Sequence, residues 1–118
     1  MSEIGKRELL LALVRCRRRP RLAGVDLSGM NLQGLVLTGA DLRGADLRRT
    51  DLSNADLTAA DLALADLAGA VLTGANLEDA RLFHADLRNA ECRGTSFSGA
   101  DMTGTRLEGV PHLELQKD

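Results

Sequence analysis

The chain has 118 residues, a formal net charge of −2 and 44% hydrophobic residues, which suits one small domain. Its aromatic residues are Phe83 and Phe97 alone, a composition that argues against nucleic-acid binding by base stacking. The two cysteines, Cys16 and Cys92, form no metal-binding or redox motif. We therefore expect a reducing, cytoplasmic setting and no metal or other cofactor.

The first 21 residues are basic, with seven Lys or Arg against Glu3 and Glu8. The segment is rich in Leu, Arg and Glu, which favour a helix, and Pro20 ends that pattern. The apolar run at residues 9–14 is too short to span a membrane. We expect a helix that covers one end of the following domain. An alternative is a membrane-surface or nucleic-acid-binding helix that uses the basic residues.

From residue 27 to residue 107, a large apolar residue occupies every fifth position. A small residue, usually Ala, stands two places before it, and a polar residue, most often Asp, stands one place before it. Gly is frequent two places after it, which suits a turn that requires a positive φ. A period of five fits neither a helix nor a flat strand and indicates a repeat architecture. The predicted core positions are Leu27, Leu32, Leu37, Leu42, Leu47, Leu52, Leu57, Leu62, Leu67, Leu72, Leu77, Leu82, Leu87, Cys92, Phe97, Met102 and Leu107.

The consensus Ala-Asp-Leu-x-x, unbroken at residues 40–44 and 45–49, resembles the pentapeptide repeat family. The resemblance covers residues 22–110 and implies that four pentapeptides make one square coil. It also implies that the coils stack as a right-handed quadrilateral β-helix. We therefore expect an all-β solenoid of about four coils, spaced like paired strands. Residues 1–21 would form an N-terminal α-helical cap, because solenoid ends need covering, and residues 111–118 a C-terminal tail.

In such a coil every fourth pentapeptide returns to the same face, so one vertical row contains Asp26, Asp46, Asp66 and Asp86. Like charges about 4.8 Å apart repel each other, and Arg48 and Arg88 on the same face can offset the repulsion. Two interpretations are open. The aspartates form the local turns and keep the coil soluble, or the row binds a partner. The family resemblance implies the second use, because some members resemble duplex DNA and bind bacterial type II topoisomerases, which protects against quinolones.

No residue pattern in the chain indicates catalysis, because a packed coil has no interior pocket and neither His84 nor His112 has a nucleophile or ligand partner. We expect a non-enzymatic scaffold that binds a protein partner through its outer faces, with no catalytic residue and no small-molecule substrate. The first alternative is a DNA-mimicking modulator of DNA gyrase or topoisomerase. The second is a membrane- or nucleic-acid-associating module that uses the basic N-terminus.

The C-terminal end of the repeat lacks a sequence that could form a robust cap. Pro111 cannot donate a ladder hydrogen bond, and the segment 112–118 is too short for a stable helix. The last core positions, Phe97, Met102 and Leu107, would then lie at an open end. This predicts a homodimer formed by stacking two C-terminal coils.

Overall fold

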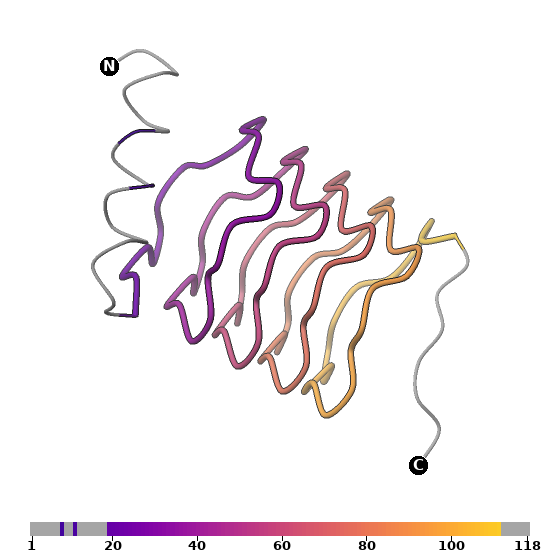
Figure 1. Ribbon diagram of the computed structural model, residues 1–118. Helices are drawn as coiled ribbons and strands as arrows, with labels where there is room; N and C mark the ends of the chain where they lie inside the picture. Colours follow the sequence, from indigo (N-terminus) through magenta and orange to yellow (C-terminus); the bar gives the residue numbers. More distant parts are fainter. Residues whose placement is uncertain (1–7, 9–10, 12–18, 112–118) are drawn as a thin grey trace.

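A computed structural model of the protein describes Glu8, Leu11 and residues 19–111. The chain winds into coils that stack along one axis in sequence order, from indigo to yellow in Figure 1. Neighbouring coils are joined by parallel bridges between residues 20 apart, from Arg21 and Asp41 to Asp86 and Arg106. One coil therefore consists of four five-residue sides. Each side contributes a single bridging residue to the sheet, so the coils pair without strands of ordinary length.

The side that contains Leu42 shows the bonding pattern that recurs around the coils. The Leu42 N–H donates to the carbonyl of Asp61 in the following coil at 2.8 Å. The Ala45 N–H donates back to the carbonyl of Leu42 at 3.0 Å and closes the corner. Gly44, the third residue of this turn, has a φ of 65°. A positive φ at that place is the requirement of a type II turn, and this explains the frequent Gly two places after the core residue.

Non-glycine residues also occupy this turn position and take the same backbone conformation. Leu64, for example, has a φ of 62°. The left-handed region costs an ordinary side chain about 1 kcal/mol, so at these corners the coil geometry overrides the local preference. The residues concerned are Arg49, Asn54, Ala59, Leu64, Asp79, His84 and Asn89.

Leucine and alanine side chains fill the inside of the coils. The core leucines from Leu32 to Leu87 are at most 1% exposed, and the alanines two places before them, where present, are equally buried. Each buried leucine contributes about 2 kcal/mol to folding. Cys92 and Phe97 are buried as well, whereas the last two predicted core residues, Met102 and Leu107, are only partly buried.

The first coil begins two residues earlier than the sequence predicted, at Pro20. Arg21 bridges to Asp41, and the Asp41 N–H donates to the Pro20 carbonyl at 2.8 Å. Pro20 and Leu22 are buried in the small and large positions of this side. The unit was missed because Pro and Arg replace the consensus Ala and Asp, although their shapes and backbone bonds serve the same coil.

The predicted N-terminal cap falls mostly outside the described residues. Glu8 and Leu11 are helical, and Leu11 is half-buried against the core. The predicted tail, apart from Pro111, also lies outside the described residues. Across Glu8, Leu11 and residues 19–111, no helix has the length and apolar character needed to cross a membrane.

Candidate interaction surfaces

The outer surface is divided into four faces, each centred on one ladder of bridging residues. We number the faces in the order in which the chain first reaches them. Their ladders are Arg21, Asp41, Asp61, Arg81 and Asp101 on face 1; Asp26, Asp46, Asp66, Asp86 and Arg106 on face 2; Asn31, Asp51, Val71 and Glu91 on face 3; and Val36, Asp56, Asn76 and Ser96 on face 4.

Face 2 brings the four predicted aspartates together, one from each successive coil. Each of them accepts a hydrogen bond at Oδ1 from the backbone N–H two residues later. For Asp46 the donor is the Arg48 N–H at 3.2 Å, and for Asp86 it is the Arg88 N–H at 3.0 Å. An aspartate that bonds to its own following backbone stabilises a turn. The consensus Asp therefore has a local structural function whether or not a partner binds.

Arginine side chains offset part of the negative charge on face 2. Arg48 binds both carboxylate oxygens of Asp46, at 2.9 and 2.7 Å, and Arg88 forms the same bidentate ion pair with Asp86. Arg48 Nε also lies 3.8 Å from Asp66 Oδ2. These guanidinium hydrogen bonds hold the pKa values of Asp46 and Asp86 below the usual range. Both carboxylates are ionised at neutral pH, yet the ladder is less anionic than a row of phosphates.

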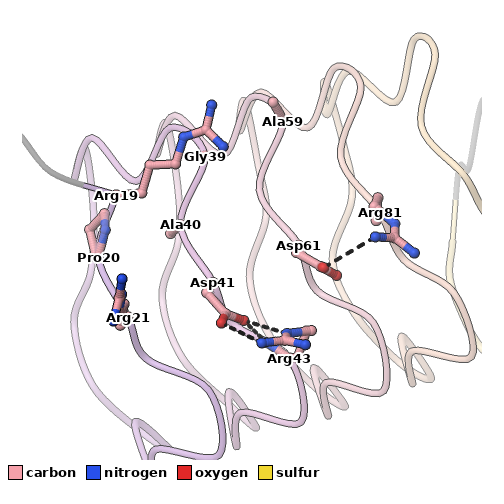
Figure 2. A pocket seen from close by; sticks show the side chains of 10 residues that line it. All are labelled: Arg19, Pro20, Arg21, Gly39, Ala40, Asp41, Arg43, Ala59, Asp61 and Arg81. Carbon is pink, nitrogen blue, oxygen red and sulfur yellow. Dashed lines mark hydrogen bonds and ion pairs between the residues drawn. The ribbon is translucent and has the colours of Figure 1, made fainter.

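Face 1 contains an open groove that crosses several coils. Its uncharged lining residues are Pro20, Gly39, Ala40 and Ala59. Figure 2 shows its charged side chains spread along successive coils: Arg19, Arg21, Asp41, Arg43, Asp61 and Arg81.

The two carboxylates in this groove each have an arginine partner. Arg43 forms a bidentate ion pair with Asp41 through two hydrogen bonds of 2.8 Å, and these lower the pKa of Asp41 to about 2. Arg81 Nη1 lies 3.4 Å from Asp61 Oδ2. The groove therefore consists of two paired carboxylates and two further arginines.

Arg19 and Arg21 have no ion-pair partner among the residues that the structure describes. The Arg19 side chain extends over Gly39, so closely that its Nε lies 3.1 Å from where a Cβ on Gly39 would stand (Figure 2). Sequence reasoning missed this pair, because both arginines stand in the segment assigned to the helical cap and neither matches the repeat consensus.

The described residues hold no group of three His, Cys, Asp or Glu side chains that could bind a metal ion. Cys92 is a free, buried thiol, and burial raises its pKa to about 11. The ring of His84 packs edge-on against Phe83, with ring centroids 4.2 Å apart. His112 and Cys16 lie outside the described residues.

The sequence matches the family model of pentapeptide repeats, in eight copies, over residues 21–58, 50–89 and 75–110. These matches cover all of the coils described above. The chain therefore belongs to the pentapeptide repeat family.

Solved structures of other pentapeptide repeat proteins are similar to the chain. HetL from Nostoc sp. strain PCC 7120, a protein involved in heterocyst differentiation regulation, is 34% identical with a TM-score of 0.65, and the match covers 83% of this chain and 50% of HetL. The chain thus spans half the length of HetL. A second Nostoc protein, alr5209, is 33% identical with a TM-score of 0.66 over 85% of this chain and 74% of its own.

A more distant match is QnrB1, a plasmid-mediated fluoroquinolone resistance protein. It is 16% identical with a TM-score of 0.53, and the match covers 74% of this chain and 58% of QnrB1. At that identity the likeness concerns the fold alone. Together the neighbours identify the fold as a right-handed β-helix solenoid. No match was found among curated proteins.

Proposed function

We propose that this chain is a non-enzymatic scaffold that binds a protein partner through its outer faces. The observation that carries the proposal is the contrast between the apolar interior of the coils and their charged exterior. Its inside is filled with leucine and alanine, and the charged side chains of the described coils stand outside, on the four ladders and on the turns that follow them. Rigid coils hold these side chains at fixed spacing, which suits recognition of a large partner. The proposal includes a cytoplasmic location, which we predict because the two cysteines form no metal-binding or redox motif.

The test begins with immobilised protein, which captures candidate partners from a cell extract. Each captured protein is then purified and titrated against the chain by calorimetry. We expect a saturable complex that is weakened by substitutions on one outer face and unaffected by substitutions on the others, with unchanged melting temperatures. If no captured protein forms a saturable complex, the scaffold function is wrong.

The alternative of a DNA-mimicking modulator of gyrase or topoisomerase is supported by one specific observation, the aspartate ladder of face 2. A suitable variant changes Asp26, Asp46, Asp66 and Asp86 to Asn. Asn31 and Asn76 already accept the turn N–H in this chain, at 3.1 and 2.9 Å, so the substitution removes charge and retains the turn.

This alternative is tested by a gyrase supercoiling assay with the purified protein, titrated with and without a quinolone. A DNA mimic inhibits or protects gyrase at low micromolar concentration, and the four-Asn variant does not. If the folded protein has no effect, the alternative is wrong and the scaffold proposal is unaffected.

We also propose that the C-terminal coil forms a homodimer by end-to-end stacking. Within the described residues no further coil covers Phe97, Met102 and Leu107, and the last two remain partly exposed. Sedimentation equilibrium at micromolar concentration should give twice the chain mass, and a monomeric mass would contradict the dimer.

The second alternative, a membrane- or nucleic-acid-associating module that uses the basic N-terminus, remains a prediction, because most of that segment lies outside the described residues.

A further inference from the structure

We propose that the groove of face 1 is the docking site for an acidic segment of the partner protein. The inference rests on the proposed scaffold function and specifies the chemistry of the partner. It is carried by Arg19 and Arg21, two guanidinium groups that line one groove and have no ion-pair partner among the described residues.

The charge count of the groove favours an anionic ligand. Four arginines and two aspartates line it, which leaves two positive charges in excess. Arg43 and Arg81 neutralise Asp41 and Asp61, so the excess lies at the end of the groove where Arg19 and Arg21 stand. Guanidinium groups bind carboxylates through paired hydrogen bonds that fix the orientation of the ligand.

The shape of the groove fits an extended chain. Ala59 lines it with a small exposed side chain and leaves room for a peptide backbone, whereas Ala40 is completely buried and Arg19 extends over Gly39. The distance from Arg21 to Arg81 is three coil spacings, roughly 14 Å, which an extended segment of about four to five residues spans. An acidic side chain at one end of the segment reaches Arg19 and Arg21. A second one reaches Arg81, whose side chain is 63% exposed.

Two observations favour a protein partner over a nucleic acid. A phosphate backbone is negative along its whole length and would face Asp41 and Asp61 in the middle of the groove, whereas a peptide can place neutral or basic residues there. In addition, Leu64 and Phe83 are 66% and 39% exposed, and they follow Asp61 and Arg81 at the next corner. These two residues do not line the groove, but exposed apolar and aromatic side chains at the edge of a charged face are typical of protein interfaces.

The test measures binding of a fluorescein-labelled peptide Glu-Ser-Ser-Ser-Glu, with acidic ends and a neutral middle, to the full chain by fluorescence anisotropy. The groove variant combines Arg19→Ser and Arg21→Ser. Ser96 already occupies a ladder position in this chain, so serine is compatible with the coil. The matched control combines Arg93→Ser and Arg106→Ser, which removes the same charge from other parts of the surface. Melting temperatures confirm that both variants are folded.

We expect this acidic-ended peptide to bind the parent, and the groove variant to bind it at least about tenfold more weakly, because two charge-assisted contacts are lost. The control should stay within about twofold, since it retains the groove. Equal losses in both variants would mean attraction by overall charge and would overturn the proposal, as would no binding to the parent. A labelled hexathymidylate that binds as tightly as the peptide and is lost in the groove variant would also overturn it, in favour of nucleic acid.

The purified partner from the capture experiment separates this inference from the scaffold function. If the partner complex is weakened by the groove variant and by added acidic-ended peptide, the groove is its docking site. If a saturable complex persists unchanged in the groove variant, the groove proposal fails while the scaffold function stands.

Discussion

The middle of the stack and its C-terminal end are built from the same pentapeptide, yet they differ in how well they are buried. Leu62 and Leu67 are completely buried, whereas Met102 and Leu107 occupy equivalent positions and are partly exposed. The middle residues are covered by a coil on either side, and no coil follows the last residues within the described chain. Burial in a solenoid is therefore a property of the place in the stack, because each coil contacts only its neighbours.

The strongest test of this comparison places a charge in the middle of the stack. Leu62→Asp should abolish folding, because an ionised carboxylate without a partner would stand at a fully buried position. Asp61→Asn is the neighbouring control and should stay within about 0.5 kcal/mol of the parent, since Asn retains the turn acceptor and the ion pair to Arg81 is exposed. Circular dichroism melts measure both. If both variants melt with the parent, the inward and outward positions have been assigned wrongly.

A milder test removes side-chain volume at the two places. Leu67→Ala should lower the free energy of unfolding by about 2–5 kcal/mol, because it leaves a cavity between two covering coils. In a monomeric chain Leu107→Ala should cost about 1 kcal/mol, since part of this side chain contacts solvent, whereas in the proposed homodimer the loss should approach that of Leu67→Ala. Chemical denaturation of both variants gives the difference. Equal losses would show that the C-terminal coil is covered in solution, as the proposed homodimer requires.

The ion pairs on the outer surface should make the melting temperature depend on pH. The arginine hydrogen bonds keep the pKa values of Asp41, Asp46 and Asp86 below their usual range, and Asp41 reaches about 2. A carboxylate with a lowered folded-state pKa stabilises the fold above its unfolded pKa of about 4, and that contribution is lost as the pH falls through the folded pKa. We expect a constant melting temperature from pH 7 to about 5 and a decline between pH 4 and 2.

A variant with Arg43, Arg48 and Arg88 changed to Ser serves as the control for this pH dependence. It should show a smaller decline below pH 4, because its aspartates lack the paired guanidinium groups. An identical decline in parent and variant would assign the acid sensitivity to other groups. All these pairs are exposed to solvent, so the effect is small beside that of a core substitution.

The smallest expected effect concerns a corner. Leu64 combines a φ of 62° with a side chain that is 66% exposed, so it carries backbone strain and contributes little packing. Leu64→Asn should raise the free energy of unfolding by about 0.5–1 kcal/mol, because Asn tolerates the left-handed region. The melting temperature measures the gain. Gly104→Ala should instead lower the melting temperature. The added Cβ would collide with the His84 side chain, and alanine would have to adopt the positive φ of Gly104.

Much of the fold could be predicted from the sequence because the repeat is strict. The spacing of five located every core position from Leu27 to Leu107, and the Gly pattern located the turns. The unit at Pro20 and Arg21 could not be found in the same way, because its residues depart from the consensus and only the bond from Asp41 to Pro20 places it in the first coil. The function of the consensus Asp as a turn acceptor likewise became definite only with the hydrogen bond from the residue two places later.

The sequence by itself determined the family, the inward and outward alternation and the alignment of Asp26, Asp46, Asp66 and Asp86, because a fixed period maps directly onto a coil. Only the tertiary structure decided which charges are paired between coils. Arg48 and Arg88 pair with aspartates two residues earlier on the same side, whereas Arg81 pairs with Asp61 in the preceding coil. Arg19 and Arg21 line the same groove as Arg81, although about sixty residues separate them in the sequence. A pair between coils depends on side-chain distances of a few ångströms, and these distances exist only once the coils are stacked.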